Sequence, residues 1–215
     1  MKENISILTI ITILFFLTPA VVISLKKFWR DKFLQLFGIY GIAAAIINLL
    51  DLFMIPYSVI EKINVLYNIL DIPFVILMLF QITRSSLVKQ MMKGSMIVYL
   101  VLQIASLVKF GWNYDSIKYS LGYGIVMIIM FSAYLLSTYV RRMNLGKLHI
   151  AHMILLGSLL FNYGSFVVIY IFDFYVEDYN MADNLMLYYI SSCVSMAMVT
   201  AGLLVPAKLE VSQRS

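Results

Sequence analysis

The stretch ISILTIITILFFLTPAVVISL, residues 5–25, carries no charged side chain and indicates at once what class of protein this is. An α-helix needs about 20 apolar residues to cross a hydrocarbon layer of about 30 Å, so this stretch is long enough for one crossing. Lys2 is the only basic residue before it, whereas Lys26 and Lys27 follow it directly. We therefore interpret it as a retained first helix with its N-terminus outside, and not as a cleaved signal peptide.

The remainder of the chain has the same apolar character. Hydrophobic residues make up 62% of the 215-residue sequence, and charged residues make up 13%. A soluble globular domain carries about 25% charged residues. A chain this apolar cannot bury its surface in one core of this size and needs lipid as a solvent. We therefore predict a multi-pass protein of the cell membrane.

Six further apolar segments follow the first, and the ten-residue alternation typical of a membrane β-barrel is absent. The expected helices cover residues 5–25, 34–59, 63–82, 96–112, 119–140, 150–172 and 185–205. The sequence thus predicts an all-α integral membrane protein, a seven-transmembrane-helix bundle that forms a single domain over residues 1–215. Because only Ile60–Lys62 separates the second and third segments, we expect a tight hairpin there.

Basic residues are distributed unevenly between the two ends of these segments. One end collects Lys26, Lys27, Arg30, Lys32, Arg84, Lys89, Lys93, Arg141, Arg142, Lys147, Lys208 and Arg214. The other end holds Lys2, Lys62, Lys109 and Lys118, together with most of the acidic residues. Since cytoplasmic loops carry the excess of Lys and Arg, we predict the N-terminus outside and the C-terminus inside. This topology explains the basic excess, so we expect the lipid bilayer and no nucleic acid as a partner.

Two polar motifs interrupt the second and third segments. INLLDLFMIP places Asn48 and Asp51 before a proline, and YNILDIP repeats this order with Asn68 and Asp71. Residues three apart share a helix face, so each asparagine should lie beside its aspartate. A charged side chain at the centre of a membrane helix costs about 2.5–3.5 kcal/mol even on the permissive insertion scale. Two such residues therefore indicate a functional site.

The expected hairpin would bring both aspartates to a similar depth in the outer half of the bundle. At 1.5 Å per helical residue, Asp51 would lie about 15 Å from the outer boundary and Asp71 about 12 Å. Pro56 and Pro73 should each free a backbone carbonyl one turn back, at Leu52 and at Ile69. A pair of nearby carboxylates disfavours double ionisation, so the pair is suited to binding a proton or a cation.

Further polar residues could join this level of the bundle. Asn162 is expected at similar depth on the sixth segment, and Ser191 and Ser192 on the seventh, while Lys109 could reach inward from the fourth. Asparagine and serine also serve as hydrogen-bonding contacts between membrane helices, and lysine near a helix end extends to the interface. Both interpretations remain open for these residues.

His149 and His152 are three apart at the expected inner end of the sixth segment, a spacing that could hold a metal or haem. No third ligand is evident, so we interpret them as an interfacial pair and expect no metal site and no cofactor. The single cysteine, Cys193, cannot form an intrachain disulfide.

Three functions are consistent with a buried Asn/Asp site. We favour proton- or cation-linked transport of a small solute. The alternative is a seven-helix sensor or receptor that signals through a separate cytoplasmic protein partner. The third is an intramembrane lipid-modifying enzyme with the aspartates as acid and base, for which no nucleophile or metal motif is present.

Overall fold

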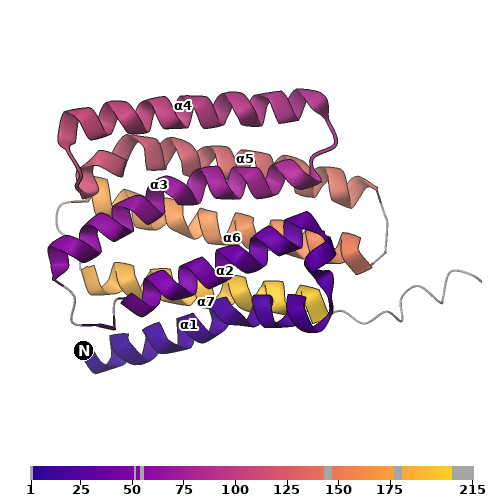
Figure 1. Cartoon of the computed structure of the whole chain (residues 1–215), viewed down its shortest axis with the longest axis horizontal. Coiled ribbons are helices and arrows are strands. Elements are labelled where there is room, and N and C mark those ends of the chain that lie inside the picture. Colours follow the sequence, from indigo (N-terminus) through magenta and orange to yellow (C-terminus); the bar gives the residue numbers. More distant parts are fainter. Residues whose placement is uncertain (1, 51, 54–55, 143–146, 177–180, 205–215) are drawn as a thin grey trace, which may run out of the picture.

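A computed structural model describes residues 2–50, 52–53, 56–142, 147–176 and 181–204, and the described residues contain seven α-helices (Figure 1). Their bounds are α1 Lys2–Leu25, α2 Lys32–Leu50, α3 Tyr57–Ile82, α4 Ser86–Phe110, α5 Lys118–Arg141, α6 Lys147–Tyr175 and α7 Met181–Leu204. Two 3₁₀ turns, η1 Phe28–Arg30 and η2 Tyr114–Ile117, precede α2 and α5. The helices run alternately between two ends of the bundle. We call these the Glu61 end, where α3 begins, and the His152 end, where α6 begins.

Six of the helices form a closed ring, because α1 packs on α2 and α7, α2 on α3, α3 on α5, α5 on α6, and α6 on α7. α4 lies at one edge of the bundle, where it contacts α3, α5 and η2 (Figure 1). α1 and α2 approach very closely, since a Cβ atom added at Gly41 would lie 2.5 Å from the backbone oxygen of Phe16. Glycine is required at such a contact.

Several polar residues are buried inside the bundle beside its apolar core, whereas many large apolar residues are exposed on its outside. Asn48 and Asn162 are each 3% exposed, whereas Val108 is 84% exposed and Leu25 is 77% exposed. All seven described helices are long and apolar enough to cross a membrane. Exposed apolar side chains together with buried polar ones are what a lipid solvent favours. The expected all-helical fold, with seven helices long and apolar enough to span a membrane, is thus confirmed.

The connection between α2 and α3 differs from the expected hairpin. α2 ends at Leu50, and α3 starts at Tyr57 with Pro56 as its N-cap residue, so Ile60–Lys62 lies within α3. Proline fixes its own backbone and disfavours helix at the preceding residue, which makes it suitable for starting a helix. Because Pro56 is not inside a helix, it frees no helical carbonyl at Leu52. The second helix therefore does not run on to Val59 as expected, and Asp51, whose depth was counted along that helix, lies outside the described residues.

The fourth helix is longer than the apolar pattern predicts. It begins at Ser86 because the Ser85 side chain accepts a hydrogen bond from the backbone N–H of Val88, as an N-cap residue does. Its first two turns contain Lys89 and Lys93, whose ammonium groups lie 5.0 and 5.7 Å from the centre of the Phe80 ring. The charged residues are thus part of the helix and not of a preceding loop.

Candidate functional site

A cavity of about 540 Å³ lies within the six-helix ring, toward the Glu61 end. It extends from Glu61 to Asp71, which are ten residues apart on α3 and therefore separated by about 15 Å along the helix. On the other side of Asp71, the interior is filled by fully buried apolar side chains, among them Phe37, Ile76 and Leu156. The bundle interior is thus hollow on the Glu61 side of Asp71 and tightly packed on the other side of Asp71.

The cavity wall combines carboxylates, amides and tyrosines. The carboxylates are Glu61, Asp71 and Asp173. The amides are Asn48, Asn64, Asn68, Asn162 and Asn184. No lysine, arginine or histidine lines the cavity among the described residues. The wall therefore presents hydrogen-bond acceptors and negative charge without a balancing cation of its own.

Asp71 is the deepest of the three carboxylates and is 7% exposed. The hydroxyl of Tyr163, a residue with no exposed surface, donates a hydrogen bond to its Oδ2 atom at 2.6 Å. The side chain of Tyr40 also approaches both Asp71 and Tyr163. The second carboxylate oxygen, Oδ1, has no hydrogen-bond partner among the described residues. A buried acceptor without a partner is uncommon and marks Asp71 as the centre of the site.

Pro73 positions this region through the carbonyls of the preceding turn. The hydroxyl of Tyr99, on α4, lies 3.2 Å from the backbone oxygens of both Asn68 and Ile69. The Ile69 carbonyl that Pro73 frees is therefore used by Tyr99 and is not directed to a bound cation.

Three predicted asparagines lie in the cavity wall with Asp71. Asn48 donates from Nδ2 to the backbone oxygen of Ala44 at 2.8 Å and to the Tyr188 hydroxyl at 3.2 Å, which links α2 to α7. Asn68 donates to the backbone oxygen of Asn64 at 2.8 Å. Asn162 is buried, and its Oδ1 atom has no partner among the described residues. Asn162 and Asp71 thus both contribute an acceptor that is not satisfied by the chain.

The mouth of the cavity is held by its two outer carboxylates. Asp173 accepts hydrogen bonds from the Asn184 side chain and, at 3.2 Å, from the Tyr114 hydroxyl. Glu61 accepts from the backbone N–H of Tyr114 at 3.3 Å. These contacts tie η2 to α3, α6 and α7, so Glu61 and Asp173 both take part in hydrogen bonds that hold the mouth together.

The other predicted residues lie outside the cavity. The Ser191 hydroxyl donates to the backbone oxygen of Tyr188 at 3.0 Å, and Ser192 is fully buried on the same helix, but neither lines the cavity. Lys109 is exposed on α4, with its ammonium group 4.9 Å from the centre of the Phe110 ring. Lys109 is therefore not brought to Asp71, and its position is that of a lysine at the membrane interface.

Sequence reasoning missed Tyr40, Tyr163 and Asn64. The two tyrosines are buried around Asp71. Nothing in their spacing distinguishes them from the others. Asn64 had a usable signal, because Asn64, Asn68 and Asp71 follow the four- and three-residue spacing that defines one helix face.

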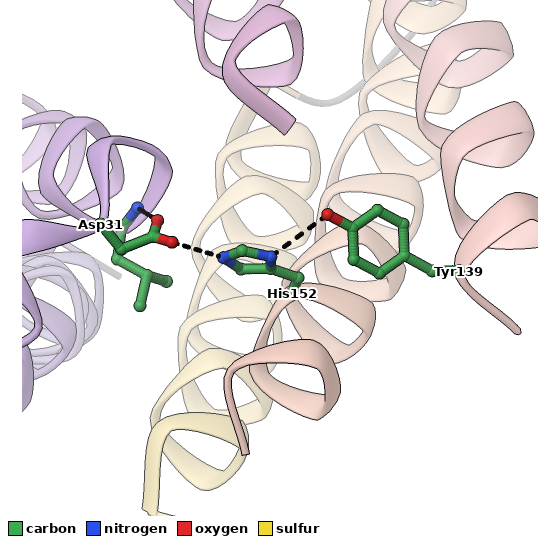
Figure 2. Close-up of polar contacts among 4 residues, drawn as sticks. Asp31, Tyr139 and His152 are labelled. Atoms are coloured by element: carbon green, nitrogen blue, oxygen red, sulfur yellow. Dashed lines mark hydrogen bonds and ion pairs between the residues drawn. The ribbon is translucent and has the colours of Figure 1, made fainter. Parts of the chain in front are cut away.

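A second polar cluster lies at the His152 end (Figure 2). His152 is buried, with its Nε2 atom 3.2 Å from Oδ2 of Asp31 in an ion-pair contact and its Nδ1 atom 3.3 Å from the Tyr139 hydroxyl. The ring of His149 stacks on Tyr139 with 4.7 Å between ring centres. His152 is thus buried and connects α6 to the start of α2 and to α5, whereas His149 packs on Tyr139.

Asp31 is also the N-cap residue of α2, since its Oδ1 atom accepts from the backbone N–H of Leu34 at 3.0 Å. Partial burial disfavours its charged form, but the contact with His152 and the Leu34 N–H more than offset this effect. Together they hold the pKa of Asp31 below its ordinary value. No motif in the sequence singles out this residue.

The described residues thus define an all-helical protein with seven membrane-length helices, six of which surround a cavity lined by carboxylates, amides and tyrosines. No protein-family model, curated protein or solved structure matches the chain. Among the residues that the structure describes, no group of three or more His, Cys, Asp or Glu side chains could hold a metal ion.

Proposed function

We propose that this protein is a membrane transporter in which the cavity takes up a small solute and Asp71 binds the proton or cation linked to its movement. One observation carries the proposal: Asp71, buried within a membrane-length helix, lies in the wall of a 540 Å³ cavity, and one of its oxygens has no partner in the part of the chain that the structure describes. Burying an ionisable group at this depth is costly, so its retention indicates use. The volume is within the range of about 300–1,000 Å³ that is usual for small-molecule sites.

The distribution of charge supports an orientation for the proposed transporter. Arg84, Lys89 and Arg142 lie at the His152 end, and the carboxylates Glu61 and Asp173 lie at the other. By the positive-inside rule we propose that the His152 end faces the cytoplasm and that the cavity faces outward in the cell membrane. The packed apolar residues on the cytoplasmic side of Asp71 would then close the pathway inward.

The proposal is tested by flux in proteoliposomes under a proton gradient and under a sodium gradient. Wild-type protein should carry protons or sodium, and Asp71→Asn should abolish this flux. Asp115→Asn is the matched control, because Asp115 is exposed in η2 and does not line the cavity. Its flux should equal that of the wild type.

A folded wild-type protein that carries no flux under either gradient would contradict transport. The same cavity would then belong to a sensor, and the search would move to a cytoplasmic protein that binds the basic end of the bundle.

A further inference from the structure

The composition of the cavity wall constrains the charge of its ligand. Glu61, Asp71 and Asp173 line it, and among the described residues no basic side chain does. An anionic solute would meet only repulsion from these carboxylates, because no described side chain in the wall could neutralise it. A cationic solute would be attracted at every depth between the mouth and Asp71.

The hydrogen-bonding state of the wall indicates that this cation carries N–H or O–H donors. Oδ1 of Asp71 and Oδ1 of Asn162 are buried acceptors that find no partner among the described residues, and both residues line the cavity. A primary ammonium group has three N–H donors and no acceptor, so it can satisfy such oxygens. The contact with a carboxylate would be charge-assisted, the stronger class of hydrogen bond.

Aromatic rings in the cavity wall provide a surface for the apolar part of an organic ligand. Phe166 stacks on Tyr188 with 5.8 Å between ring centres, and Tyr188 meets Tyr189 edge to face at 5.2 Å. All three line the cavity. Aromatic faces attract organic cations and cover apolar carbon. A bare sodium ion would need a compact set of oxygen ligands and would leave both this aromatic surface and most of the 540 Å³ unused.

We propose that the cavity binds a small organic amine in its ammonium form, with the ammonium group at Asp71 and Asn162 and the apolar part against Phe166 and Tyr188. The inference deepens the proposed function, since it names the ligand class of the same cavity and makes the ligand's own ammonium group the cation that Asp71 binds. It concerns binding alone and holds whether the bound amine is transported or sensed.

The test uses the full chain in lipid nanodiscs and calorimetric titration with three probes of one shape. The probes are 2-phenylethylamine, the neutral 2-phenylethanol and the anionic 3-phenylpropanoate, each at the same pH and ionic strength. The amine should bind wild-type protein at least about tenfold more tightly than the alcohol, the difference expected of a charge-assisted contact, and the carboxylate should not bind. This comparison needs no variant and therefore does not depend on a variant folding.

Variants then assign the binding to Asp71. Asp71→Asn should weaken amine binding by about tenfold or more, and Asp115→Asn should leave it unchanged. Equal binding of amine and alcohol, or equal amine binding by Asp71→Asn and the wild type, would overturn the inference. Amine binding without flux would contradict transport and leave this inference standing, whereas flux without amine binding would do the reverse.

Discussion

The hydrogen bond from Tyr163 to Asp71 gives the sharpest prediction for the site. We expect Tyr163→Phe to lower the free energy of unfolding, because it removes the donor that satisfies Oδ2 of a buried carboxylate while keeping the ring. The oxygen–oxygen distance of 2.6 Å is within the range of about 2.5–2.7 Å for an O–H group that donates to an ionised oxygen.

The expected magnitude follows from two ranges. Hydrogen bonds to charged groups contribute about 1.5–3 kcal/mol in soluble proteins. Double-mutant cycles between membrane helices average about 0.6 kcal/mol and reach about 1.7 kcal/mol. Since this bond is short and has a carboxylate as its acceptor, we expect a coupling energy near the upper membrane value, about 1.5 kcal/mol.

The assay is a double-mutant cycle of Tyr163→Phe and Asp71→Asn, with unfolding measured reversibly in mixed detergent micelles. Tyr134→Phe is the matched control, because Tyr134 is 46% exposed on α5 and does not line the cavity. Its effect should stay within about 0.5 kcal/mol. A coupling energy below about 0.5 kcal/mol would refute the assignment of a charge-assisted bond to this pair.

Three further predictions concern the bundle that holds the site. Gly41→Ala places a Cβ atom 2.5 Å from a backbone oxygen of α1 and should lower the free energy of unfolding by about 1–3 kcal/mol. Gly164→Ala, whose added Cβ atom would meet nothing within 4 Å, should leave the free energy of unfolding unchanged. The pKa of Asp31 is lowered, so its contacts with His152 and the Leu34 N–H stabilise the fold above the unfolded pKa of 3.8, and this contribution, about 1 kcal/mol or less, is lost as the pH falls through the lowered value. Tyr99→Phe should lower the free energy of unfolding by about 1 kcal/mol. The loss should be smaller in a Pro73→Ala background, because the alanine N–H can donate to the Ile69 carbonyl that Pro73 leaves free.

Each of these predictions has an outcome that would contradict it. Equal unfolding free energies for the two glycine variants would show that α1 and α2 are not in backbone contact. Asp31→Asn keeps a side chain that can cap α2, so an unchanged acid dependence of unfolding in this variant would exclude the ion pair with His152 as its source. If the effects of Tyr99→Phe and Pro73→Ala on the free energy of unfolding were strictly additive, the Tyr99 hydroxyl would not be the hydrogen-bond partner of the Ile69 carbonyl.

The helices were predictable from the sequence because a lipid solvent requires long apolar segments, and all seven were found. Their ends were less predictable. The apolar residues that follow Asp51 hide the end of α2, and only Pro56 marks the start of α3. Conversely, Lys89 and Lys93 resemble a loop in composition, yet their long side chains allow them to lie in the first turns of α4.

The site was predictable where it depends on depth along a helix. Asp71, Asn48, Asn68 and Asn162 were placed at one level by counting residues, and the structure brings them into one cavity. The contribution of Tyr163 depends on which way α6 is rotated toward α3, and no pattern within one helix contains this information. The contact of Asp31 with His152 likewise joins residues 121 positions apart, so only the packed bundle reveals it.

The central claim is that the cavity is reached from outside and favours cations, and cysteine modification tests it most directly. Cys193 is the only cysteine and is replaced by serine, after which Asn64→Cys places a thiol in the cavity wall and Asp115→Cys places one on the exposed surface of the same end. Right-side-out vesicles are treated with a membrane-impermeant cationic methanethiosulfonate and with its anionic counterpart. The account predicts that the cation reacts at least about tenfold faster with the cavity thiol, relative to the surface thiol. Equal relative rates, or faster reaction with the anion, would contradict it.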